Sequence, residues 1–117
     1  MSEVKIFHNP VCSKSRGAME ILADRGVDAD VTEYLKAPPD RATLERIVSL
    51  LDDEPSALVR HDKRFKELEL NATDYVTAAA VIDLLLAHPE LMERPVVIVG
   101  DRAVIARPPE KLLDLLG

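Results

Sequence analysis

The sequence predicts one domain of the α/β class, with the element order β-α-β, a helical middle, and then β-β-α. Two short β-prone segments, residues 4–7 and 31–35, flank a stretch with helical spacing at residues 13–25. Two further β-prone segments, residues 95–99 and 103–106, are separated only by turn residues. The length of 117 residues suits a single domain with a core of its own.

The first three segments are expected to form a β-α-β unit. Residues 4–7 are β-prone and end before Pro10, which cannot continue a sheet ladder. Apolar residues recur at helical spacing through residues 13–25, and Gly26 stands where a helix commonly ends. Residues 31–35 alternate and include β-branched side chains. A unit of this length normally pairs its two strands in parallel.

The middle of the chain is expected to be helical. Asp40 is a favourable N-cap for a helix with apolar residues along one face. Thr77 is a second N-cap, and residues 78–87 after it are apolar nearly all round, which predicts a buried helix. Residues 56–70 carry charges of both signs and predict a short helix with loops.

The last part of the chain predicts a β-hairpin and a final helix. Residues 95–99 are rich in β-branched side chains, residues 100–102 have turn chemistry, and residues 103–106 form the expected antiparallel partner. Pro108 and Pro109 then precede a leucine-rich segment that predicts the helix.

The composition argues against several classes of protein. The net charge of -6 disfavours general nucleic-acid binding. No apolar run approaches the roughly 18 residues of a membrane span, and the N-terminus lacks the basic and apolar segments of a signal peptide. The one cysteine, Cys12, excludes an internal disulfide and, by itself, a thiolate zinc cluster. A lone reduced thiol is typical of a cytoplasmic protein, which is the expected location.

The charges are unevenly distributed along the chain. Acidic residues dominate residues 19–59, whereas basic residues are in excess in residues 1–18 and 60–66. If the two basic segments meet in space, they form a site for a small anion; the alternative is a solvated charged surface.

Cys12 stands between the end of a predicted strand and the start of a predicted helix. The free N–H groups of the first helical turn stabilise a thiolate there, and they also attract anions. The alternative is a small buried residue with no chemical role. Residues 12–15 fit the C-x-x-S form of a single-thiol redox site. A phosphatase loop is disfavoured, because Arg16 follows Cys12 after three residues and not after five.

His8 and Ser15 flank the cysteine in this segment. His8 is a candidate proton partner or a group that favours the Cys12 thiolate; the alternative is a surface histidine at the end of a strand. Ser15 is either a supporting residue or only part of the helix start. The spacing of His8, His61 and His88 does not match a metal site, so no metal is expected.

Several segments together resemble one known family. Residues 8–16, HNPVCSKSR, resemble the H-N-P-x-C-x-x-S-R segment of the glutaredoxin-coupled arsenate reductases. Residues 58–60, LVR, with residues 65–68, FKEL, resemble the central arginine segment of that family. Residues 88–97, HPELMERPVV, resemble its H-P-x-L-x-x-R-P stretch, and residues 105–110, IARPPE, its final R-P-x-E. The matched blocks occur in the same order and cover most of the chain.

The resemblance implies a thioredoxin-like fold over residues 1–117, with a helical insertion at about residues 39–93. In such folds a cis-proline faces the active cysteine, and Pro95 is the candidate, so we expect it to be cis and to lie beside Cys12. The sequence departs from the family at Glu69, where glycine is often found.

The resemblance also implies roles for particular side chains. Cys12 corresponds to the nucleophile, and His8, Ser15 and Pro95 are its supporting residues. The arginines that correspond to the oxyanion pocket are Arg60, Arg94 and Arg107. Composition alone does not single out these three arginines.

The function implied by the resemblance is the reduction of arsenate to arsenite for arsenic detoxification. Glutathione and glutaredoxin are the expected partners, with glutathione as a co-substrate and no tightly bound cofactor. No nucleic-acid or membrane partner is expected. The lone cysteine fits this scheme, because external thiols must supply the electrons.

Three alternatives remain open from the sequence. The first is a glutathione-dependent thiol reductase of the same fold that acts on another substrate. The second is a non-enzymatic regulator that binds RNA polymerase, although many such proteins carry C-x-x-C and this chain has Ser15 in the second position. The third is a single-thiol glutaredoxin, which typically has valine where this chain has Arg94.

Overall fold

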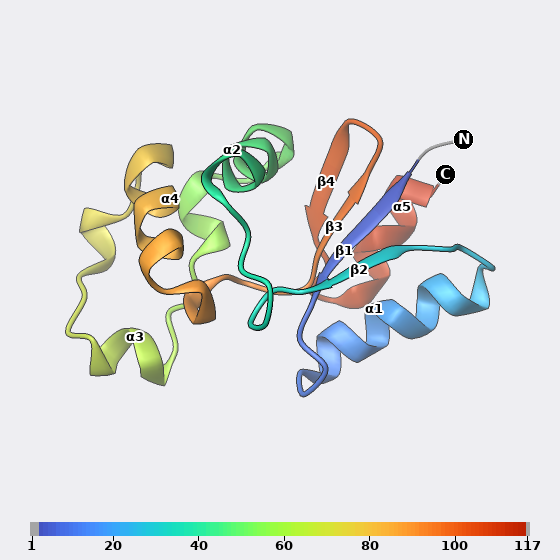
Figure 1. The fold of residues 1–117 in the computed structure, drawn as a ribbon, viewed down its shortest axis with the longest axis horizontal. Helices are drawn as coiled ribbons and strands as arrows, with labels where there is room; N and C mark the ends of the chain where they lie inside the picture. The colour runs from blue at the N-terminus through green and yellow to red at the C-terminus, as the bar shows by residue number, and fades with distance from the viewer. Residues whose placement is uncertain (1–2, 117) are drawn as a thin grey trace.

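A four-stranded mixed sheet forms the centre of the structure, a computed structural model that describes residues 3–116. The strand order is β2-β1-β3-β4, with β1 parallel to β2 and antiparallel to β3 (Figure 1). The strands are β1 (Val4–His8), β2 (Asp30–Glu33), β3 (Val96–Val99) and β4 (Arg102–Ile105). The predicted parallel β-α-β pair and the predicted antiparallel hairpin are both confirmed.

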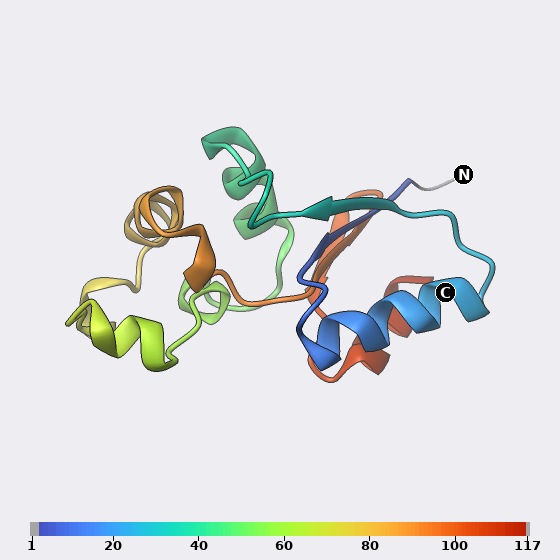
Figure 2. The same cartoon turned by 60° about the horizontal axis from the view of Figure 1, so that its bottom comes forward.

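One face of the sheet is covered by the first helix and the last ones, as Figure 2 shows. These are α1 (Ser13–Asp24), the 3₁₀ turn η4 (Pro109–Leu112) and α5 (Leu113–Leu116). Alternate side chains of β1 and β3 point to this face, where Ile6 and Val97 meet Leu22 and Leu112 in one apolar cluster. The cluster holds α1 against the sheet and therefore fixes where α1 begins.

The other face of the sheet packs against the helical region between β2 and β3. Phe7, Val96 and Ile98 enter a second, larger cluster with residues of that region. Its elements are α2 (Arg41–Leu50), η1 (Pro55–Leu58), α3 (Lys63–Glu67), η2 (Ala72–Asp74), α4 (Ala78–Ala87) and η3 (Pro89–Leu91). The chain enters and leaves this region near the end of the sheet at which β1 ends (Figure 1).

Both predicted N-caps begin their helices as expected. The Asp40 side chain accepts a hydrogen bond from Thr43 N (2.9 Å), and the Thr77 hydroxyl accepts one from Ala80 N (3.2 Å). Gly26 ends α1 with a φ of 66°, a left-handed conformation that glycine adopts at no steric cost. The predicted burial of α4 holds for one face only, because Val81, Ile82, Leu84 and Leu85 are buried whereas Asp83 and Leu86 face outward.

Several boundaries differ from the prediction by one or two residues. β2 ends at Glu33, because the N–H groups of Lys36 and Ala37 both donate to the Glu33 carbonyl and turn the chain. β4 begins at Arg102, one residue early, and the final helix starts as the 3₁₀ turn η4. Within residues 3–116, every helix is too short or too polar to cross a membrane.

Candidate functional site

The loop between β1 and α1 places Cys12 at the start of α1. Cys12 is the N-cap residue of this helix, and its carbonyl accepts the first helical hydrogen bond, from Arg16 N (3.0 Å). Cys12 N donates to the Asn9 carbonyl (3.0 Å), and Val11 N donates to the Asn9 side chain (3.1 Å). These bonds fold the loop so that the half-buried thiol faces the free N–H groups of the first turn.

Several groups act on the ionisation of the Cys12 thiol. Burial by itself raises its pKa, but hydrogen bonds from Ser15 N, the Arg94 side chain and Lys14 N lower it, as does the Arg94 charge. The resulting pKa is about 7, below the ordinary value of 9.0. A substantial fraction of Cys12 is therefore a thiolate, the reactive form, at neutral pH. The Lys14 contribution comes from its backbone N–H and not from its ammonium group.

His8 and Ser15 contact one another beneath the loop. Ser15 is fully buried, and its Oγ accepts a hydrogen bond from Asn9 N (2.9 Å) and lies 2.7 Å from His8 Nδ1. Burial lowers the pKa of His8, while Glu33 raises it and Arg16 lowers it, so the ring is neutral at pH 7, and its Nδ1 shares a hydrogen bond with the serine hydroxyl. His8 is buried, so the alternative of a surface histidine is wrong. Its direct contact is with Ser15.

Arg94 is buried against the thiol. Only 7% of the residue is exposed, and its guanidinium lies close enough to Cys12 to lower the pKa of the thiol. Its Nε is buried and has no hydrogen-bond partner among residues 3–116. The peptide bond between Arg94 and Pro95 is cis, which confirms the expected cis conformation of Pro95, while the expected position of Pro95 beside Cys12 stays a prediction; the bond between Arg107 and Pro108 is cis as well.

Arg107 reaches the same sulfur from the end of β4. Its Nη1 lies 3.8 Å from Cys12 Sγ and donates to the Arg94 carbonyl (3.0 Å). On its other side, Nε lies 3.8 Å from the Glu93 carboxylate. The sequence reasoning did not single out Glu93, since only the folded chain brings it to Arg107.

Arg60 makes no hydrogen bond with Cys12 within residues 3–116, whereas Arg107 does. Backbone hydrogen bonds join its segment to the one before Arg94: Arg60 N donates to Leu91 O, and Glu93 N donates to Leu58 O, both at 2.7 Å. The Arg60 guanidinium pairs with Asp62 at 3.3 Å. The rest of the basic segment 60–66 turns away from Cys12, and Arg64 pairs there with Glu67 and Glu90.

Tyr34 is a site residue that the sequence reasoning missed. It is 1% exposed and follows β2, next to the end of β1 in the parallel register. Burial raises the pKa of its phenol; Arg94, a hydrogen bond with the Asn9 side chain and Arg60 lower it, and Cys12 raises it. The phenol is therefore a neutral hydrogen-bond donor among the groups of the site. The sequence feature that could have identified Tyr34 is its position at the end of the strand predicted to pair with the strand before Cys12.

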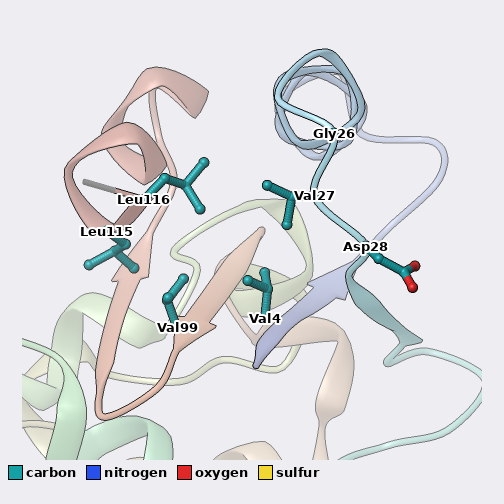
Figure 3. A pocket seen from close by; sticks show the side chains of 7 residues that line it. All are labelled: Val4, Gly26, Val27, Asp28, Val99, Leu115 and Leu116. Atoms are coloured by element: carbon teal, nitrogen blue, oxygen red, sulfur yellow. The ribbon is translucent and has the colours of Figure 1, made fainter. Parts of the chain in front are cut away.

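Two other features do not contribute to this site. A cavity of about 580 Å³ lies at the opposite end of β1, where Val4, Val27 and Val99 face Leu116 (Figure 3). It is far along the strand from Cys12 and mostly apolar. No cluster of three or more His, Cys, Asp or Glu side chains that suits a metal ion occurs within residues 3–116.

Comparison with known proteins shows the family of the chain. The sequence model of the ArsC family matches residues 7–115, which include Cys12 and all three arginines. The chain belongs to the ArsC family. Among ArsC relatives, the arsenate reductase of Neisseria meningitidis (strain Z2491) is 40% identical over 99% of this chain and 100% of its own length. The uncharacterized protein YfgD of Escherichia coli K12 is 39% identical over 98% of both chains.

Solved structures of the family share this architecture. The arsenate reductase from Vibrio cholerae superposes with a TM-score of 0.87 at 34% identity, covering 97% of this chain and 98% of that one. The fold of this ArsC protein is thus thioredoxin-like, as the sequence resemblance implied.

Proposed function

We propose that this protein is an arsenate reductase, an oxidoreductase that reduces arsenate to arsenite through the thiolate of Cys12. The observation that supports this most directly is the buried Arg94 Nε, which has no hydrogen-bond partner among the described residues. A buried donor without an acceptor costs about 1–3 kcal/mol, and more when the group is charged. In the proposed complex the guanidinium turns towards a tetrahedral oxyanion beside Cys12, which supplies the missing acceptor. The relatives from Neisseria meningitidis and Vibrio cholerae are named arsenate reductases.

Arg94 and Arg107 are proposed to bind the arsenate, with Arg60 at the edge of the pocket. Guanidinium groups suit this role because their planar donors match two oxygens of one anion. The N-terminus of α1 adds free N–H groups at the same place. Net charge of the whole chain is -6, so these close contacts must supply the affinity.

The first chemical step is the attack of the Cys12 thiolate on arsenic. A sulfur–arsenic(V) bond forms, and one arsenate oxygen takes up protons and leaves as water. The Arg107 guanidinium, 3.8 Å from the sulfur, is placed to offset the negative charge that develops on the arsenate oxygens. The covalent adduct divides one difficult reduction into easier steps.

Two external thiols complete the proposed reaction. The thiolate of glutathione attacks the Cys12 sulfur and forms a mixed disulfide, while the electron pair of the sulfur–arsenic bond passes to arsenic, which leaves as arsenite. Arsenic thus gains two electrons, and two thiols are oxidised to one disulfide. A glutaredoxin thiolate then attacks the glutathione sulfur and releases Cys12 as a thiolate. The chain has no second cysteine to do this work.

Glutathione is accordingly proposed as a co-substrate, and no tightly bound cofactor is needed. The expected location is the cytoplasm, where the glutathione pool keeps thiols reduced.

The test is a coupled assay of arsenate reduction with glutathione and glutaredoxin. We expect wild-type protein to require both thiols, and Cys12→Ser to have no activity, because a serine hydroxyl is a far weaker nucleophile at neutral pH. Ser13→Ala is the matched control, since Ser13 is the exposed neighbour on the same helix. Substantial arsenate reduction by Cys12→Ser would refute the mechanism.

The same assay separates the alternatives. Turnover of a glutathione mixed disulfide without arsenate reduction would indicate a thiol reductase with another substrate. Inactivity on both substrates, together with retention of RNA polymerase in a pull-down, would indicate a regulator.

A further inference from the structure

The Glu93 carboxylate lies at the edge of the proposed anion pocket. Its Oε1 is 3.8 Å from Arg107 Nε, while Nη1 of the same guanidinium is 3.8 Å from Cys12 Sγ. The same carboxylate oxygen accepts a hydrogen bond from Arg94 N (3.3 Å). One guanidinium therefore contacts both the nucleophilic sulfur, through Nη1, and a carboxylate, through Nε. A negative charge is unexpected next to a pocket for an anion, because like charges repel.

The backbone fixes Glu93 in this position. Glu93 N donates to Leu58 O (2.7 Å), and the preceding residue, Met92, forms an antiparallel bridge with Val59. The Glu93 side chain is 22% exposed, so solvent screens its charge only in part. The carboxylate is thus a built feature of the pocket edge and not a mobile surface group.

A carboxylate at this place distinguishes oxyanions by their protons. An ionised carboxylate only accepts hydrogen bonds. Arsenate and phosphate keep at least one proton at neutral pH and can donate it, whereas sulfate has none. In the proposed arrangement, an oxyanion lies between Arg94, Arg107 and Cys12, and one of its oxygens faces the Glu93 carboxylate that shares the Arg107 guanidinium with the sulfur. For a protonated oxyanion this contact is a charge-assisted hydrogen bond, and for sulfate it is a repulsion between two anions.

We infer that Glu93 is a specificity-determining residue, which selects oxyanions that carry an acidic proton over fully ionised sulfate. This inference rests on the proposed function, because it requires an oxyanion pocket at Cys12. Glu93 does not take part in the attack of the sulfur on arsenic. It acts through the hydrogen bond to the anion, and its pairing with Arg107 keeps it in place.

The experiment measures how inorganic phosphate and sulfate protect Cys12 from alkylation by iodoacetamide. The experiment is done at mildly alkaline pH, where both ions are mainly dianions of similar size. They then differ chiefly in the one proton that phosphate keeps. We expect phosphate to protect wild-type protein at lower concentration than sulfate. In Glu93→Gln the preference should fall by about tenfold to a hundredfold, the value of a hydrogen bond to a charged group. Each variant is compared with its own rate without anion.

Asp83→Asn is the matched control. It removes one negative charge from an exposed pair with Arg41 on the helical region, so it changes the net charge equally and should leave the preference unchanged. Glu93→Ala is the second variant, and it should lose the preference as Glu93→Gln does. Sulfate inhibition of arsenate reduction, measured in the same variants, should increase in parallel.

The remaining outcomes overturn the inference. If both anions protect Cys12 equally more strongly in Glu93→Gln than in wild type, Glu93 only reduces the positive charge of the pocket. If both anions protect Cys12 equally less strongly in that variant, Glu93 only positions Arg107. If wild type reduces arsenate and Glu93→Gln keeps its preference, the inference alone fails. If neither anion protects Cys12 and arsenate is not reduced, the proposed function fails with it.

Discussion

The Arg107 guanidinium lies against the Cys12 sulfur, with 3.8 Å between Nη1 and Sγ, although the two residues are 95 positions apart. The sheet creates this contact, because β1 leads into the Cys12 loop and β4 ends just before Arg107. Arg94 joins them from the start of β3, and its carbonyl accepts a hydrogen bond from Arg107. The candidate site is thus assembled from three strand ends.

The first prediction concerns the pH dependence of Cys12 reactivity. The thiolate is the reactive form, so the alkylation rate of wild type should fall as the pH drops through about 7, the pKa of Cys12. Arg94→Ala removes a hydrogen bond and a positive charge that lower this pKa. The pKa should therefore move up towards 9.0, and a rise from about 7 to about 8 lowers the thiolate fraction at neutral pH roughly fivefold, with a larger loss for a larger rise. Iodoacetamide kinetics across a pH series measure this change.

Arg64→Ala is the control for this prediction. Arg64 is a cation of the same kind, but it pairs with Glu67 and Glu90 away from the thiol. Its removal should leave the alkylation profile unchanged. Equal shifts in the Arg64 and Arg94 variants would contradict a specific effect of Arg94.

The sequence predicted most of the local structure correctly. The N-caps Asp40 and Thr77 act within one helical turn, so neighbouring residues suffice to locate them. The end of α1 at Gly26 could likewise be predicted from the sequence, because glycine adopts the left-handed conformation found there at no steric cost. The parallel and antiparallel pairings follow from connection lengths and turn residues.

Other parts of the site depend on contacts between distant segments. The bridge between Val59 and Met92, which brings Glu93 to Arg107, has no signal in the residues themselves. The burial of Tyr34 results from a turn just after β2, where the alternation of side chains had indicated a longer strand. The roles of Arg60, Arg94 and Arg107 came from the family resemblance and stay predictions, although the structure places Arg94 and Arg107 at Cys12.

The second prediction separates anion binding from thiol chemistry at Arg94. Arg94→Ala should reduce arsenate turnover about tenfold to a hundredfold, because it removes a charge-assisted hydrogen bond to the anion. Arg94→Lys should recover only part of this, since an ammonium lacks the planar fork of a guanidinium. Turnover of a neutral mixed disulfide should change much less in both variants.

Both substrates must be measured at a pH where Cys12 is ionised in all variants. The difference in thiol pKa then no longer affects the comparison. Equal losses on arsenate and on the mixed disulfide would show that Arg94 supports the thiolate or the fold and does not bind the anion.

The third prediction concerns the support of the Cys12 loop by Ser15. Ser15→Ala leaves the buried Asn9 N–H without its acceptor and removes the partner of His8 Nδ1. The free energy of unfolding should decrease by about 1–3 kcal/mol, measured by urea denaturation. Ser13→Ala, on the exposed side of the same helical turn, should change it by less than about 0.5 kcal/mol. Similar values for the two variants would mean that the Ser15 network does not stabilise the loop.

The last prediction starts from the backbone at Glu69. Within residues 3–116, Glu69 is the non-glycine residue with a positive φ, 55°. It follows α3, where its N–H donates to Lys66 O (3.0 Å) and the N–H of Leu70 donates to Phe65 O (3.4 Å). These two bonds form a Schellman motif, which requires a left-handed residue at the position of Glu69 and usually has glycine there.

Glu69→Gly should therefore stabilise the protein. A side chain with a Cβ costs roughly 1–2 kcal/mol in the left-handed conformation, whereas glycine loses about 0.5–1 kcal/mol more backbone entropy on folding. The balance favours glycine by up to about 1.5 kcal/mol, which corresponds to a rise in Tm of up to several degrees for a chain of this size. Glu69→Ala removes the charge but keeps the Cβ, so its Tm should stay near that of wild type. An equal rise in both variants would assign the effect to the lost carboxylate and not to the backbone.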